Sequence, residues 1–177
     1  VLPTETAMRA GKGAAWYRPR TEIHKPVETV YTVHAGEDLP AVVERAEAGA
    51  VVELADAGGD YAIARAMVVK VPLTIRAAKN GARPVVRFNG AKGDNMVTIA
   101  DGGDLRIEGI AFSGTLEAGK ALAKAGISTT AEMIRPYNLR IDNCEFFDFG
   151  EGGFFAVKGL QATFAGRVEI RNSLFRD

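Results

Sequence analysis

The stretches LRIEGIAF (Leu105–Phe112), LRIDNCEF (Leu139–Phe146) and VEIRNSLF (Val168–Phe175) share one pattern. Each copy has an apolar residue, an Ile two places later, then Gly or Asn, and ends on Phe. A weaker copy, LTIRAA, begins at Leu73. The copies start about 30 residues apart, a spacing typical of repeat architectures built from stacked units. We therefore expect a stack of similar turns of chain.

Apolar and charged residues alternate within each copy. Leu139 and Ile141, for example, flank Arg140, and Asp142 follows. This period of two is typical of a strand with one buried face. The strand is followed by Gly or Asn, the residues that adopt a left-handed backbone most readily. Each copy is thus interpreted as a strand, a sharp corner and a second strand.

A unit of this size with only short strands cannot bury its own apolar face, but stacked units can. We predict an all-β fold, a right-handed single-stranded parallel β-helix. Leu105, Leu139 and Val168 should stack, as should Phe112, Phe146 and Phe175, and Asn143 and Asn172 should form a buried ladder of side-chain amides. Other short strands are expected in VVRF (from Val85), MVTIA (from Met96), EMIRP (from Glu132) and FFAVKG (from Phe154). The alternative is a β-sandwich, which does not require the same pattern at the same corner.

The segment GEDLPAVVERAEAG predicts a short amphipathic helix over residues 37–48. Leu39, Val42, Val43 and Ala46 fall at helical spacing, with Pro40 near the start and a glycine just past the end. Terminal units of a solenoid need a cover for their exposed apolar end. We expect this helix to cap the N-terminal end of the stack.

Composition narrows the function classes. The 22 basic and 22 acidic residues give a formal net charge of zero, so the basic character typical of a nucleic-acid-binding domain is missing. No apolar run is long enough to predict a membrane span. We expect neither nucleic acid nor membrane as a partner. The single cysteine, Cys144, should point into the core and be inert.

The domain organisation follows from the change in pattern. Residues 1–29 are rich in charge, glycine and proline and lack periodicity, so they are interpreted as a linker or the tail of a preceding domain. Residues 30–177 are expected to form the β-helix domain. VEIRNSLFRD stops inside a repeat, so this domain is expected to be truncated at its C-terminal end.

The segment after the predicted helix contains a spaced set of glycine, apolar and aromatic residues: Gly49, Val52, Leu54, Gly59, Tyr61, Leu73, Thr74, Ile75 and Ala77. This set resembles the opening pattern of polysaccharide lyases of the chondroitinase-B and alginate-lyase family, and LRIEGIAFSG is similar to a later motif of that family. The resemblance extends from residue 36 onward. The GKGAAWYRP segment resembles the end of a first β-helix domain in members with two. The resemblance therefore implies that this chain is the start of a second, C-terminal β-helix domain that follows a catalytic one.

The resemblance implies β-elimination on a uronate-containing polysaccharide, alginate or a glycosaminoglycan, outside the cytoplasm, in the periplasm or extracellular space. Such chemistry needs a cation at the uronate carboxylate, either Ca²⁺ or a basic side chain, and a lysine base. Arg135 and Lys158 occur in the opposite order to the family's pair, and Lys158 lacks the family's N-K-S context. We assign no catalytic residue, metal ligand or cofactor to this chain, leave Ca²⁺ to the full-length enzyme, and expect Lys70, Arg135 and Lys158 to contact anionic polysaccharide.

Other polar residues are interpreted as surface features. An acidic group over residues 142–151, comprising Asp142, Glu145, Asp148 and Glu151, could hold Ca²⁺, but a solvated rim is favoured. Two separated histidines, His24 and His34, match no metal or triad signature. Two function classes stay open: an accessory part of a lyase, inactive by itself, or a non-catalytic carbohydrate-binding or structural module.

Overall fold

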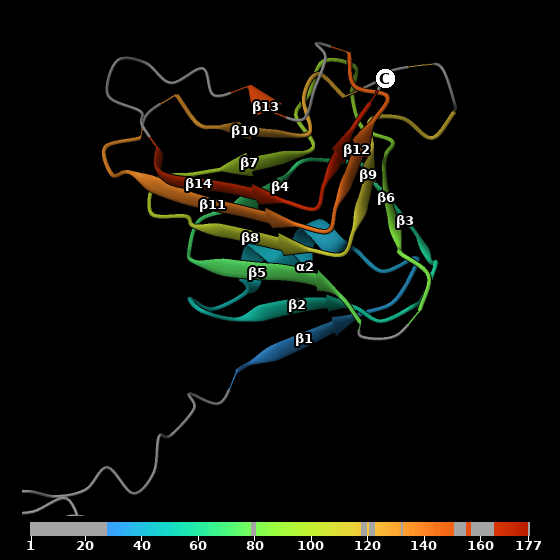
Figure 1. Ribbon diagram of the computed structural model, residues 1–177, viewed down its shortest axis with the longest axis horizontal. Coiled ribbons are helices and arrows are strands. Elements are labelled where there is room, and N and C mark those ends of the chain that lie inside the picture. The colour runs from blue at the N-terminus through green and yellow to red at the C-terminus, as the bar shows by residue number, and fades with distance from the viewer. Residues whose placement is uncertain are drawn as a thin grey trace, which may run out of the picture.

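The computed structural model describes residues 28–78, 81–117, 120, 123–131, 133–150, 155–156 and 165–176. The regular secondary structure of this part of the chain is almost entirely strand, arranged in three parallel sheets (Figure 1). The six-stranded sheet contains, in spatial order, β1 (Val30–Val33), β2 (Val51–Leu54), β5 (Leu73–Ala77), β8 (Leu105–Glu108), β11 (Tyr137–Asp142) and β14 (Ala165–Arg171).

The other two sheets take up the strands between. The five-stranded sheet contains β3 (Asp60–Ile63), β6 (Val85–Phe88), β9 (Ala111–Ser113), β12 (Glu145–Phe147) and β15 (Leu174–Phe175). The four-stranded sheet contains β4 (Met67–Val69), β7 (Val97–Ile99), β10 (Ile127–Thr129) and β13 (Phe155–Ala156). From β2 onward the chain enters the six-, five- and four-stranded sheets in turn, and we call one such passage a round.

Successive rounds stack in register. Leu73 pairs with Leu105, Leu105 with Leu139, and Leu139 with Val168. Every strand pairing in the described residues is parallel, so they do not form a sandwich of antiparallel sheets. The repeated pattern therefore predicted the stacking correctly, including the weaker copy at Leu73.

One expected strand is displaced. Residues 133–136 of the EMIRP segment form no strand, and the strand of that round lies earlier, at β10. VVRF is β6, and MVTIA contains β7. FFAVKG contains the two-residue strand β13, and the rest of it lies outside the described residues.

The corner between the six- and five-stranded sheets has a left-handed backbone. The φ angles are 72° at Gly109, 53° at Asn143 and 49° at Asn172, as expected for residues that tolerate this conformation. The predicted internal amide ladder, however, is wrong, because Asn143 and Asn172 are both exposed. The corner directs their side chains outward, where Asn143 Oδ1 accepts a hydrogen bond from Arg83 and Asn172 Nδ2 donates one to Asp142.

Inside the same corner the phenylalanines stack as predicted. The ring centroids of Phe112 and Phe146 are 4.9 Å apart, and those of Phe146 and Phe175 are 5.2 Å apart. Cys144 lies beside this stack in the core, with its thiol directed to the backbone oxygens of Ile107 and Asp142. Burial raises the pKa of this thiol, which agrees with the inert role expected for it.

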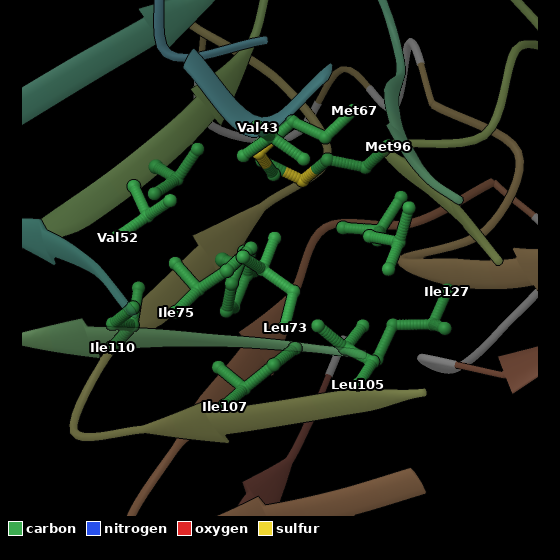
Figure 2. Packing of buried hydrophobic residues seen from close by; sticks show 14 of the residues in the cluster. Val43, Val52, Met67, Leu73, Ile75, Met96, Leu105, Ile107, Ile110 and Ile127 are labelled. Atoms are coloured by element: carbon green, nitrogen blue, oxygen red, sulfur yellow. The ribbon is translucent and has the colours of Figure 1, made fainter. Parts of the chain in front are cut away.

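The main core lies between the three sheets. A column of inward residues, Val52, Ile75, Ile107 and Ile141, runs along the six-stranded sheet, and each is completely buried. Figure 2 shows several of them together with Met67, Met96 and Val43. Because each round covers the apolar side chains of its neighbour, the alternating pattern buries one face of every strand.

Helix α2 (Leu39–Arg45) is shorter than the predicted 37–48 helix. Asp38 accepts a hydrogen bond from the backbone of Ala41 and so caps the N-terminus, and Pro40 occupies the first turn. The helix packs against β4, the first strand of the four-stranded sheet, and contacts β1 and β3. Leu39, Val42 and Val43 are buried in the core, so α2 covers the first round as expected. No helix in the described residues is long and apolar enough to cross a membrane.

At the end of the stack away from α2, the apolar residues of the six-stranded sheet are more exposed. Val168 is 45% exposed and Ile170 is 41% exposed, whereas Leu139 and Ile141, one round earlier, are at most 1% exposed. The inward side chains of the last described round thus have an open apolar surface.

Candidate functional site: a charged groove on the six-stranded sheet

Two of the three basic residues predicted to contact polysaccharide lie where the chain passes from the four-stranded to the six-stranded sheet. Lys70 directly follows β4 and is exposed, and Arg135 precedes β11. Arg135 is 65% exposed but forms an ion pair with Asp101, whose carboxylate also accepts hydrogen bonds from the backbone of Ile134 and Arg135. These backbone hydrogen bonds, led by that from Arg135, lower the pKa of Asp101. Lys158 lies outside the described residues.

A larger concave surface lies elsewhere. A groove of about 850 Å³ follows the outer face of the six-stranded sheet and its corner toward the five-stranded sheet. Its charged and amide side chains are Glu28, Arg76, Arg83, Arg106, Glu108, Asp142 and Asn143. A second groove of about 340 Å³ lies on the same face and shares Thr74 and Arg106 with the first. We call the two together the sheet-face groove.

Sequence analysis did not single out this groove, although its signal was present. Charged residues occupy the outward positions of LTIRAA, LRIE, LRID and VEIR, the same repeats that form the sheet. The alternation assigns these side chains to the outer face. It does not show that they lie beside a concavity, since the groove depends on the corner loops of several rounds.

Ion pairs run along the strands of this face. Arg106 Nε lies 2.6 Å from Glu108 Oε1, and Arg140 Nη2 lies 3.8 Å from Asp142 Oδ2. On β5, Arg76 Nε lies 2.9 Å from Glu53 Oε2 of β2. The sheet-face groove therefore presents both guanidinium and carboxylate groups to solvent. Such a surface can bind ligands that carry an anionic group together with hydroxyl donors.

Arg83 connects distant rounds at one end of the groove. Its Nη2 donates to Asn143 Oδ1 at 2.8 Å, and its Nη1 lies 3.5 Å from Glu145 Oε2. Glu145 also pairs with Arg176 at 2.7 Å. Within the part of the chain that the structure describes, no three His, Cys, Asp or Glu side chains come together as metal ligands. Of the acidic group considered for Ca²⁺, Glu145 lies between two arginines and Glu151 is outside the described residues.

His34 lies at the far end of the fold from Arg176, in the turn between β1 and α2. Its Nδ1 is 2.8 Å from Asp56 Oδ1, and the other oxygen of Asp56 accepts a hydrogen bond from the backbone of Ala35. The hydrogen bond with Asp56 raises the pKa of His34, and the negative charge of Asp56 adds to the effect. The His34 side chain is 61% exposed, as expected for a surface residue. His24 lies outside the described residues.

The ionisable side chains that line the sheet-face groove are arginines and carboxylates. The residues that line it include no lysine, histidine or tyrosine. Uronate β-elimination needs a base and a cation placed together at one sugar. The described lining contains arginines that could neutralise a carboxylate, and no lysine lies among these described residues.

No protein-family profile and no curated protein matches this chain. Solved structures do match. The PL6 family alginate lyase AlyGC superposes with a TM-score of 0.65 and 28% sequence identity over 91% of this chain. A single-residue mutant of the same enzyme gives a TM-score of 0.64 and 23% identity over the same share. The chain spans 22% of the length of each of these structures. Their similarity supports a relationship to polysaccharide lyases of the alginate-lyase type, with an all-β fold of parallel sheets.

Proposed function

We propose that this chain is an accessory section of an alginate-lyase-like enzyme whose full-length form cleaves uronate polysaccharide by β-elimination. The observation that carries the proposal is the similarity of 91% of the chain to a PL6 alginate lyase at 28% identity. The accessory section follows a catalytic β-helix domain, as the family resemblance of the segment before residue 30 implies. The full-length enzyme acts in the periplasm or extracellular space, where such polymers occur.

The detailed fold is part of the proposal. The strands visit three sheets in turn and pair in parallel with the strand of the preceding round. Crossovers between parallel strands of one sheet are almost always right-handed. Both points support a right-handed, single-stranded parallel β-helix capped by α2, the architecture expected of a chondroitinase-B-like C-terminal domain.

The accessory role rests on the distribution of charge. Arg135 is ion-paired with Asp101, and no lysine, histidine or tyrosine is found among the described groove residues. We assign contact with the anionic polymer to Lys70, Arg135 and Lys158, the last from sequence alone. Exposed charges are strongly screened, so this contact should be weak and should fall as salt rises. We place any Ca²⁺ in another part of the full-length enzyme, as the family resemblance implies.

The test uses the ultraviolet absorbance of the double bond that β-elimination creates beside the carboxylate. The purified 177-residue chain should give no absorbance increase with polymannuronate, polyguluronate or dermatan sulfate, with or without Ca²⁺. The full-length enzyme should give one with at least one of these polymers. Turnover by the isolated chain that disappears in Lys158→Ala would overturn the accessory role. A full-length enzyme that binds the polymers without turnover would favour a non-catalytic carbohydrate-binding module.

A further inference from the structure

We propose that the sheet-face groove contains a binding subsite for one carboxylated sugar, formed by Arg106 and Glu108 of β8 and by Arg140 and Asp142 of β11. This subsite lies on the outer face of the six-stranded sheet, whereas Lys70 and Arg135 lie in the loops that lead into that sheet. The inference rests on the proposed function for the choice of a uronate ligand, whereas the position of the subsite follows from the charge arrangement of the face.

The four side chains form two rows that run across the strands. In the register of the sheet Arg140 lies opposite Arg106, and Asp142 lies opposite Glu108. Adjacent strands are about 4.8 Å apart, so the two arginines project from neighbouring positions on the outer face, as do the two acidic residues. Figure 1 shows β8 and β11 as neighbours in the six-stranded sheet, with β14 beyond β11 at the edge.

This segregation of charge is unfavourable for folding. Like charges directly opposite one another on neighbouring strands destabilise a sheet, and opposite charges stabilise it. The next strands on either side follow the favourable rule: Arg76 of β5 lies opposite Glu108, and on β14 Glu169 lies opposite Arg140 and Arg171 opposite Asp142. Like charges face each other at both outward positions only between β8 and β11, which suggests that this block serves a ligand.

The four charged side chains of the subsite are accessible from the grooves, and one of their hydrogen-bonding atoms has no partner. The larger groove is lined by Arg106, Glu108 and Asp142, and the smaller by Arg106 and Arg140. Arg140 Nε is buried without a hydrogen-bond partner in the described residues. The pairs Arg106–Glu108 and Arg140–Asp142 are partly exposed, and exposed ion pairs contribute little free energy. An incoming carboxylate can therefore compete for the arginines.

The two rows match the two sides of a uronate ring. Guanidinium groups bind carboxylates through paired, charge-assisted hydrogen bonds, so Arg106 and Arg140 together would hold the sugar carboxylate. Ionised Glu108 and Asp142 accept hydrogen bonds only, and the ring hydroxyls are donors. A neutral sugar would leave the arginine row without an anion, and a simple carboxylate would leave the acidic row without donors.

The experiment is a calorimetric titration of the 177-residue chain with tetramannuronate and tetraguluronate at low salt, with cellotetraose as the neutral probe. At least one uronate should bind and cellotetraose should not. Arg106→Gln and Arg140→Gln should each raise the dissociation constant about tenfold, which is the loss of affinity typical of one charge-assisted hydrogen bond. The matched control is Arg87→Gln, on β6 and outside the grooves, which also removes an ion-paired arginine (Arg87–Asp60, 2.8 Å) and should leave affinity unchanged.

Melting temperatures of all variants report whether they fold. If Arg106→Gln does not fold, Arg106→Lys keeps the positive charge, loses the planar donors and should still weaken binding. The subsite would be overturned if Arg106→Gln and Arg140→Gln bound as tightly as the wild type while Lys70→Gln and Arg135→Gln lost affinity. That outcome would leave the proposed polymer contact at Lys70 and Arg135 intact. Failure of the wild-type chain to bind any uronate would overturn both. Equal binding of cellotetraose, or equal loss in Arg87→Gln, would overturn the uronate assignment.

Discussion

Arg83 and Asn143, which are 60 residues apart in the chain, are joined by a hydrogen bond of 2.8 Å at the corner of the six-stranded sheet. Arg83 precedes β6 and Asn143 precedes β12, so the contact passes over an intervening round. It lies on the outer surface of the stacked rounds, where Asn143 is exposed. Asn143 thus has two separable roles: its backbone adopts the left-handed corner, and its side chain links two rounds.

Replacing Asn143 separates these roles. Asn143→Ala should lower the free energy of unfolding by about 1–2 kcal/mol, because alanine is disfavoured at a φ of 53° and the bond to Arg83 is lost. Asn143→Gly loses the same bond but keeps the corner, so it should cost less. Gly109 already occupies the equivalent position one round earlier. Denaturant midpoints of the two variants provide the measurement, and equal losses would mean that the side-chain contact dominates.

Phe146 occupies the middle of the aromatic stack and is 1% exposed. Phe146→Ala should lower the free energy of unfolding by about 3–5 kcal/mol, since it removes a large buried ring and leaves a cavity. Phe175→Ala, at the partly exposed end of the same stack, serves as the matched control and should cost clearly less. Guanidinium unfolding measures both. Similar losses at the two positions would show that the end of the stack is as well covered as its middle.

Gly114 lies where backbone segments of two rounds approach closely. A Cβ atom placed on it would lie 2.2 Å from the backbone oxygen of Asp148, a contact that requires movement of the main chain. Gly114→Ala should therefore destabilise the fold by about 1–3 kcal/mol, the usual effect of overpacking. At Gly166 the nearest atom would be 3.1 Å away, in the side chain of Asn138, so Gly166→Ala is a milder control. Thermal unfolding should rank the two variants in this order.

The pair formed by His34 and Asp56 should make stability depend on pH. The pKa of His34 is raised from its ordinary value of 6.5. The contribution of His34 to the free energy of unfolding is therefore fully present below that value and is lost as pH rises through the higher pKa of the folded state. The pKa of Asp56 is lowered, first by the backbone N–H of Ala35 and then by His34. Its contribution is present above its ordinary value of 3.8 and is lost as pH falls through the lower folded value.

The pair should therefore be most stabilising in mildly acidic solution, between these two ordinary values. The difference in melting temperature between wild type and His34→Gln should be largest near about pH 5.5 and shrink by about pH 8.5, where the imidazole is neutral. Glu37, whose carboxylate accepts a hydrogen bond from the backbone of His34, is retained in both proteins. Since both partners are exposed, added salt should reduce the difference. A pH-independent difference would contradict the assignment.

Much of the fold could be predicted from local sequence patterns. Alternation placed Leu105, Leu139 and Val168 on one face, and the spacing of the copies predicted that they would stack. The Gly or Asn at each corner indicated a left-handed bend, and the corner was found where the pattern put it. The alternation and the corner depend on residues close in sequence, and the stacking depends on the recurrence of the same pattern in several copies.

Only the tertiary structure decided what the outward residues meet. The predicted stacking of Leu105 on Leu139 already implies that Arg106 faces Arg140, but it does not show that these side chains border a groove, because the groove also depends on corner residues of other rounds such as Arg83. Asn143 was expected inside and lies outside, where its side chain accepts a hydrogen bond from Arg83. Only the tertiary structure brings Arg83 within 2.8 Å of Asn143, 60 residues later and across an intervening round, because this contact depends on how the rounds pack on their shared core and no local period encodes it.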